Sequence, residues 1–180
     1  MAGSDEPAER SGRRGARWGA DFQPDRLALL ELRTWKAYYR RQPARLFGLL
    51  VLALREQAAI PWPRAVYAAA LLTKAAVGFA RSTGDYDRFA PDVARGYRAL
   101  GLAAGTAAGE SIARLYAALY AVPLETVSEA GRLRGVAAEV RDRGATAEPD
   151  APRGEGRAYW PEVAGLLRDS YRSLSSAVRD

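Results

Sequence analysis

The side chains with the clearest capacity for chemistry lie between residues 33 and 45, where basic and aromatic residues are interleaved without an acidic one. The basic members are Arg33, Lys36, Arg40, Arg41 and Arg45, and the aromatic members are Trp35, Tyr38 and Tyr39. On a helix, positions three or four residues apart are neighbours, so Arg33, Lys36 and Arg40 form a positive ridge. Such a ridge can bind phosphates while aromatic rings stack on bases, or it can bind anionic lipid. These eight residues are the candidate site for an anion or a partner molecule.

The same segment also has a purely structural interpretation, which we favour. Trp35 and the two tyrosines can belong to the core, and Arg40 and Arg41 can stand at a helix C-terminus because the helix dipole attracts cations there. A second basic group, four arginines between residues 10 and 17, is partly neutralised by nearby acidic residues. It is therefore interpreted as a solvated arm rather than as a binding element.

The residue types that are missing restrict the catalytic chemistry. The chain has no cysteine, histidine or asparagine, which excludes disulfides, thiolate nucleophiles, histidine acid–base catalysis and most zinc sites. The carboxylate pairs Asp85/Asp87 and Glu125/Glu129 are interpreted as solvated surface, because bundles that hold metals between carboxylates also use histidine. We expect no catalytic residue, no metal ligand and no cofactor, and hence no enzyme.

Composition predicts one folded domain with an electropositive N-terminal part. The 180 residues are 48% hydrophobic and 27% charged, with a formal net charge of +6, and a chain of this length forms one domain with a proper core. Residues 1–64 carry 12 basic and 7 acidic side chains. Of the 27 basic residues only Lys36 and Lys74 are lysines, so part of the arginine content can reflect GC-rich codons rather than phosphate binding.

No stretch is typical of a targeting or membrane segment. The first 26 residues are polar, and the longest apolar run, residues 46–54, is nine residues long. A membrane-spanning helix needs about 18–20 apolar residues. We expect a cytoplasmic protein without a transmembrane segment.

The hydrophobic spacing predicts an all-α fold, a compact bundle of six or seven short helices. Apolar residues recur at intervals of three and four, and prolines or glycines mark the ends of the segments. Helices are expected at about 25–41, 44–58, from the Ile60–Pro63 corner to 81, from 91, around 112–119, from the Val122-Pro123 turn through 133–140, and from 161. The second helix is apolar on almost every side, so it is expected to be the central one, with Leu50 or Leu52 fully buried.

A shift of the chain by 62 residues indicates an internal repeat. It places Trp35 on Tyr97 and the Ile60-Pro61 corner on Val122-Pro123. Residues 25–81 and 87–143 would then be two related three-helix units, followed by a closing helix. The predicted organisation is a disordered basic arm (1–24), one helical domain (25–180) and an exposed loop (144–157) within it.

These observations favour a non-enzymatic helical module that binds another protein or associates with itself. The alternative is a nucleic-acid-binding accessory protein that uses the N-terminal basic and aromatic region. Attachment to an anionic membrane surface is a third and less favoured hypothesis. The residues name neither the partner nor the oligomeric state.

Overall fold

The computed structural model describes residues 21–82, 84, 87–101, 112–147 and 158–179. The elements are α1 (Pro24–Tyr39), α2 (Pro43–Ala58), α3 (Trp62–Arg81), the short 3-10 helix η1 (Asp87–Phe89), α4 (Ala90–Ala99), α5 (Ile112–Tyr120), α6 (Leu124–Ala147) and α7 (Trp160–Arg179). These ranges contain helices and no strand, so the predicted all-α helical bundle is confirmed. In the same ranges, no helix combines the length and the apolarity that crossing a membrane requires.

Prolines determine where most helices begin. A proline stands in the first turn of α1, α2, α3, α4 and α7, and Pro123 directly precedes α6. This is the position that proline suits, because an N–H in the first turn has no acceptor within the helix. The predicted helix positions therefore agree with the observed ones to within a few residues.

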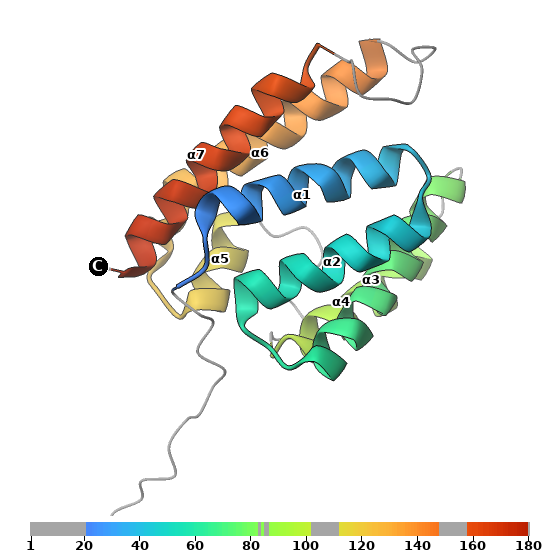
Figure 1. Ribbon diagram of the computed structural model, residues 1–180, viewed down its shortest axis with the longest axis horizontal. Helices are drawn as coiled ribbons and strands as arrows, with labels where there is room; N and C mark the ends of the chain where they lie inside the picture. The colour runs from blue at the N-terminus through green and yellow to red at the C-terminus, as the bar shows by residue number, and fades with distance from the viewer. Residues whose placement is uncertain (1–20, 83, 85–86, 102–111, 148–157, 180) are drawn as a thin grey trace, which may run out of the picture.

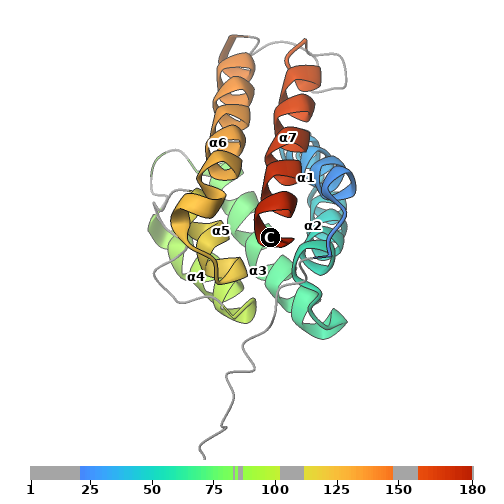
Figure 2. The same cartoon turned by 90° about the vertical axis from the view of Figure 1, so that its left-hand side faces the viewer.

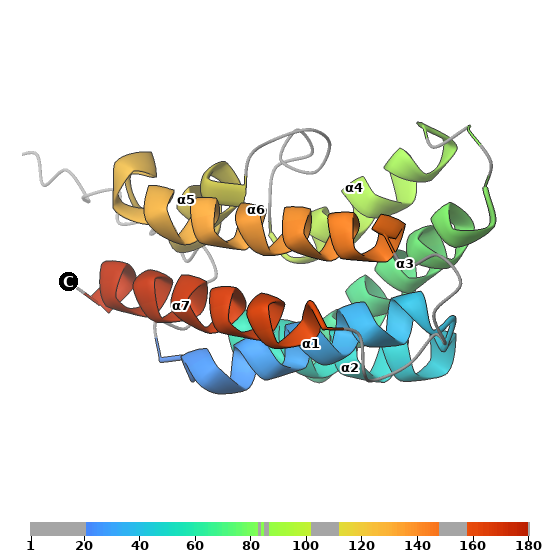
Figure 3. The same cartoon turned by 90° about the horizontal axis from the view of Figure 1, so that it is seen from above.

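The helices form an almost closed ring. Each packs mainly on its neighbours in the order α4, α3, α2, α1, α7, α6, α5, so α4 and α5 are the two ends of the described ring. Figures 1 and 2 show α7 and α6 as an antiparallel pair beside α1, with α2, α3 and α4 continuing away from α1. Seen from above, α5 lies beside the first turns of α6 (Figure 3). This arrangement turns one side of every helix toward a common interior.

The expectation that α2 is the central buried helix was wrong. Leu52 is 42% exposed and Leu50 is only partly buried. The buried residues of α2 form a single stripe, namely Leu46, Val51, Leu54 and Ala58. Because α2 is a member of the ring, with α1 on one side and α3 on the other, its remaining side is exposed to solvent although it is apolar.

Two predicted segment boundaries also need correction. Phe22 is only 2% exposed and packs against Tyr120 and Tyr171, so an arm cannot extend to residue 24; residues 1–20 lie outside the described ranges. Helix α6 continues to Ala147, which places residues 144–147 in a helix instead of a loop. Gly144 lies there against the Tyr159 ring. Residues 148–157 are outside the description.

The proposed repeat stays a prediction, although the two proline corners share local geometry. Ala59 and Ala121, which are 62 residues apart, both have positive φ, at 49° and 54°, and the helices that follow start at Trp62 and Leu124. The packing differs, since α1 packs along α2 whereas α4 packs along α3. Gly101 follows the end of α4 with φ +87°.

Candidate ligand-binding pocket

The structure divides the predicted basic and aromatic cluster into two parts. Arg33, Arg41 and Arg45 are exposed. Arg40 is the C-cap residue of α1, and the ammonium of Lys36 lies 5.4 Å from the centre of the Trp160 ring. The aromatic members, Trp35, Tyr38 and Tyr39, are partly buried and face other helices.

Tyr39 illustrates this structural role. Its hydroxyl donates a hydrogen bond to Asp142 Oδ1 at 3.0 Å, and its ring packs edge-on against Trp160 at 6.2 Å between ring centres. Burial raises the pKa of Tyr39 to about 12. Tyr39 therefore packs between helices, and the binding of an anion or a partner by the eight residues stays a prediction.

A pocket of about 180 Å³ lies in the interior of the ring, and we call it the inner pocket. All seven α-helices contribute to its wall, for example with Trp35, Leu50, Leu72, Tyr97, Tyr116, Arg134 and Tyr171. The wall is mostly apolar and aromatic, with a few polar groups converging on it. This composition is typical of sites that bind small molecules.

The Glu31 network, made of Glu31, Arg134 and Tyr171, occupies one side of the inner pocket. Arg134 on α6 donates from Nε to Glu31 Oε1 at 2.8 Å, and its Nη2 lies 2.5 Å from the same oxygen. Tyr171 on α7 donates its hydroxyl hydrogen to Glu31 Oε2 at 2.5 Å. Both carboxylate oxygens of Glu31, which lies on α1, thus accept hydrogen bonds from residues of α6 and α7.

Burying the Glu31 network in the interior of a small protein costs free energy. The side chains of Glu31 and Arg134 are 9% and 23% exposed, and removing charges from water costs several kcal/mol per ion. Apolar residues of similar volume are often as stabilising as such a buried pair. A buried charged pair that lines a pocket is therefore a candidate functional feature.

The ionisation states in the inner pocket are firmly set at neutral pH. Desolvation lowers the pKa of Arg134, but the Glu31 carboxylate and the Tyr116 and Tyr171 phenols together outweigh this effect, so the pKa lies well above its ordinary value. Burial, reinforced by Glu31, raises the pKa of Tyr171 well above 10.0. Burial likewise raises the pKa of Tyr97. The arginine stays charged and the phenols stay protonated, which suits fixed hydrogen-bond donors better than proton-transfer catalysts.

Tyr116 on α5 lines the inner pocket, but its hydroxyl is buried beside Tyr171 and Ser170 and is not open to the pocket. The residue is 2% exposed, and its hydroxyl has no hydrogen-bond partner in the structure, although Tyr171 and Ser170 are close by. The Ser170 hydroxyl donates instead to the carbonyl oxygen of Ala130 at 2.7 Å. Burial raises the pKa of Tyr116 to about 12, so it is a neutral hydrogen-bond donor. A buried donor without an acceptor costs free energy, and an oxygen atom of a ligand would supply one only if the side chains that cover the hydroxyl move aside.

Two further pockets lie nearby, and each shares lining residues with its neighbour. The middle pocket, of about 280 Å³, shares Trp35, Leu50 and Tyr97 with the inner pocket. Arg141 lines it, with its guanidinium 4.3 Å from the centre of the Trp35 ring.

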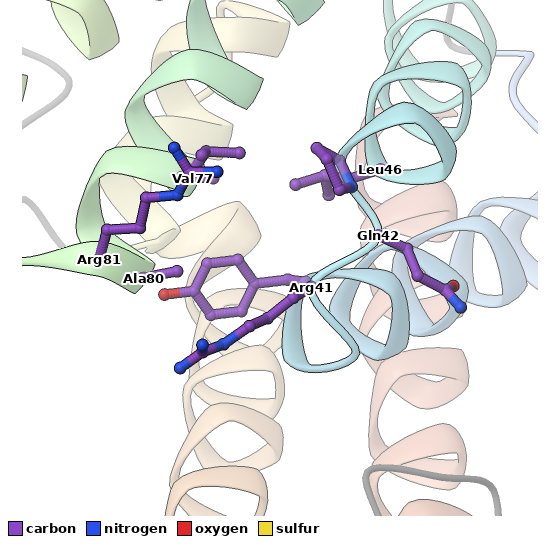
Figure 4. Close-up of a pocket in the computed structure, with 9 residues that line it drawn as sticks. Arg41, Gln42, Leu46, Val77, Ala80 and Arg81 are labelled. Atoms are coloured by element: carbon purple, nitrogen blue, oxygen red, sulfur yellow. The ribbon is translucent and has the colours of Figure 1, made fainter.

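The outer pocket, of about 170 Å³, shares Tyr38 and Leu46 with the middle pocket. In Figure 4, Leu46 and Val77 face each other across its opening. The three pockets therefore have shared walls from the end of α1 to the centre of the ring.

Sequence reasoning missed the Glu31 network, although a signal was present. Glu31 is one turn from the apolar residues Leu27, Ala28 and Trp35 of α1, and Arg134 follows Ala130 by one turn on the buried side of α6. A charged residue on the apolar side of a predicted helix requires a buried partner. The sequence does not identify that partner, because Glu31 and Arg134 are 103 positions apart.

No metal site competes with this interpretation in the part of the chain that the structure describes, since no group of three or more acidic side chains there could hold an ion. Glu129, one of the carboxylates considered from the sequence, pairs with Arg132 on the surface of α6.

Comparison with known proteins adds no assignment: no family model, no curated protein and no solved structure matches this chain.

Proposed function

We propose that this protein binds a small, mostly apolar molecule inside its ring of helices and that it does not catalyse a reaction on it. The observation that carries the proposal is the mostly apolar inner pocket, to which every α-helix contributes and beside which the unpartnered hydroxyl of Tyr116 is buried. An acceptor oxygen on a ligand that displaces the side chains covering that hydroxyl would satisfy it. The protonated tyrosines and the neutralised arginine support binding rather than acid–base chemistry.

The size and charge of the inner pocket restrict the ligand class. An apolar cavity of about 150 Å³ holds one aromatic ring, and the inner pocket has about 180 Å³. Glu31 and Arg134 neutralise each other, so this end of the ligand should be uncharged. Rings such as those of Trp35 and Tyr97 favour a flat or flexible apolar body.

Calorimetric titration with benzene, phenol and naphthol tests the proposal. Phenol should bind more tightly than benzene, because its oxygen can accept the Tyr116 hydrogen bond. Tyr116→Phe should remove this preference, by about 0.5–1.5 kcal/mol or roughly two- to tenfold in affinity. Tyr67→Phe, at a tyrosine that is 55% exposed, is the matched control and should change nothing.

A stability measurement separates a binding role of Tyr116 from a structural one. Without ligand, Tyr116→Phe should leave the free energy of unfolding unchanged or raise it, because the hydroxyl has no partner to lose. A structural hydroxyl would make the variant less stable. Absence of binding for all three probes at millimolar concentration would refute the proposed function.

Interaction with a protein partner is a second candidate, supported by exposed apolar residues on α2 and α3. Leu52, Trp62, Val66 and Tyr67 are between 42% and 55% exposed. Trp62 and Val66 lie one turn apart on α3, and neighbouring exposed apolar residues are typical of interaction sites. If the partner is a second copy, sedimentation should show a concentration-dependent dimer that Trp62→Glu abolishes. Leu124→Glu on α6, also at an exposed leucine (42%), should have no effect. Nucleic-acid binding through the basic cluster stays a prediction.

A further inference from the structure

We propose that the outer pocket is a second binding site, which takes a carboxylate attached to a single ring or to a branched hydrocarbon of similar size. This site is separate from the one of the proposed function, because the outer and inner pockets have no lining residue in common. The proposal follows from three features of the outer pocket: its two arginines, the charge of the elements around it and its apolar wall.

Two arginine side chains line the outer pocket, and they come from different elements. Arg41 lies at the corner between α1 and α2, and Arg81 is the last residue of α3. Neither forms an ion pair with an acidic side chain in the described ranges. Figure 4 shows the two arginines on different walls of the pocket, with Gln42 extending away from the opening. An anion in this pocket would therefore meet two guanidinium groups that have no carboxylate partner among the described residues.

The elements around the outer pocket carry few acidic side chains. No acidic residue lines the pocket among the described residues, and the sequence has none between Glu31 and Glu56 or within α3. Glu56 itself pairs with Arg26 at 3.2 Å. A guanidinium group can bind a carboxylate through two parallel hydrogen bonds. Because Arg41 and Arg81 are exposed, a bound carboxylate would keep part of its hydration and would avoid most of the desolvation cost of a buried ion pair.

The rest of the wall is mostly apolar and limits the size of the ligand. Besides the two arginines and Gln42, it consists of Tyr38, Pro43, Leu46, Ala76, Val77 and Ala80. The outer pocket has a volume of about 170 Å³, and an apolar cavity of about 150 Å³ holds one aromatic ring. The ligand should therefore carry a compact apolar body, which would cover this wall and remove apolar surface from water.

A purely structural role of the two arginines predicts a different behaviour. Arg41 follows α1 and Arg81 ends α3, and the helix dipole attracts cations to the C-terminus of a helix. In that case their charges would serve the helices alone, and the pocket would not distinguish an anion from a neutral molecule of the same shape. Arg33 and Arg45 are suitable for comparison, because both are exposed and neither lines the outer pocket.

The experiment compares benzoate, benzyl alcohol and acetate by NMR titration of the backbone amides, at millimolar ligand and constant ionic strength. We expect benzoate to bind roughly three- to tenfold more tightly than benzyl alcohol, because each exposed charge contact contributes up to about fivefold. Benzoate should shift the amide signals of residues 41–46 and 76–81, and added salt should reduce its advantage. Equal affinity for benzoate and benzyl alcohol, or shifts confined to other residues, would overturn the proposal. Acetate that binds as tightly as benzoate would also overturn it, because the apolar wall would then contribute nothing.

Two double variants test the role of the arginines. Arg41→Gln combined with Arg81→Gln should abolish the preference for benzoate over benzyl alcohol and leave benzyl alcohol binding unchanged. Arg33→Gln combined with Arg45→Gln removes the same net charge away from the pocket, so it is the matched control and should keep most of the preference. Circular dichroism should show the same helix content in both variants, since all four side chains are exposed. A preference that survives the first variant, or that falls equally in the control, would overturn the proposal.

These outcomes do not depend on the proposed function, because Arg41 and Arg81 do not line the inner pocket. If phenol binds but benzoate shows no preference over benzyl alcohol, this inference fails and the proposed function stands. If benzoate binds through the two arginines and phenol does not bind, the outer site stands by itself.

Discussion

Replacing Arg134 with methionine should leave Glu31 as a buried carboxylate without its counter-charge. Methionine fills much of the volume of the arginine side chain, so lost packing is a minor contribution. In the wild type, Glu31 accepts hydrogen bonds from two nitrogens of Arg134 and from the Tyr171 hydroxyl. Only the hydrogen bond from Tyr171 survives in the variant.

The expected loss follows from the burial of the pair. The side chains are 9% and 23% exposed, so solvent screening is weak and the range for breaking a buried ion pair applies, about 3–5 kcal/mol. The surviving hydrogen bond from Tyr171 places Arg134→Met at the lower end, about 3 kcal/mol. Because the free energy of unfolding of a domain is about 5–15 kcal/mol, the variant should still fold.

Urea unfolding followed by circular dichroism measures the effect. Arg132→Met, two positions earlier on α6 at an exposed pair with Glu129, is the control and should not change the free energy of unfolding measurably. Adding Glu31→Gln to Arg134→Met should restore stability, because the buried charge disappears while the amide oxygen can still accept from Tyr171. A loss below about 1 kcal/mol for Arg134→Met, or a further loss in the double variant, would refute the interpretation of the network.

Three further predictions concern packing and pH. A Cβ on Gly131 would lie 2.5 Å from the Ala113 nitrogen, whereas a Cβ on Gly135, one turn later, would meet no atom. In urea unfolding, Gly131→Ala should therefore lower the free energy of unfolding by about 1–3 kcal/mol. Gly135→Ala should raise it by about 0.5–1 kcal/mol. Leu174→Ala, at a fully buried leucine, should cost about 2–5 kcal/mol in the same assay, and equal stability to the wild type would contradict the core assignment. Burial raises the pKa of Tyr116 from 10.0 to about 12. The contribution of Tyr116 to the free energy of unfolding should therefore be fully present below pH 10 and should fall by about 2–3 kcal/mol as the pH rises toward 12. This loss of stability at high pH should be smaller in Tyr116→Phe.

Much of the local structure could be predicted from the sequence because its causes are local. Proline positions and apolar spacing act within one or two turns, so the helices were placed to within a few residues. The sequence was a poorer guide to which face of each helix is buried. Leu52 is 42% exposed although its helix is apolar on most sides, because only the ring of neighbours decides which side is covered.

The candidate site depends on contacts that no local pattern specifies. The basic and aromatic cluster was recognised, but its separation into core aromatics and surface arginines follows from the way α1 packs between α2 and α7. Arg41 and Arg81 line one pocket because the ends of α1 and α3 meet there.

The amino-acid sequence by itself determined the helices, the absence of cysteine and histidine chemistry, and the presence of a charged residue, Glu31, on an apolar helix face. Only the tertiary structure decided which groups Glu31 meets. Its partners Arg134 and Tyr171 are 103 and 140 positions away, on α6 and α7. Helix formation depends on neighbours three and four residues away, whereas the pocket exists only once distant helices have closed into a ring.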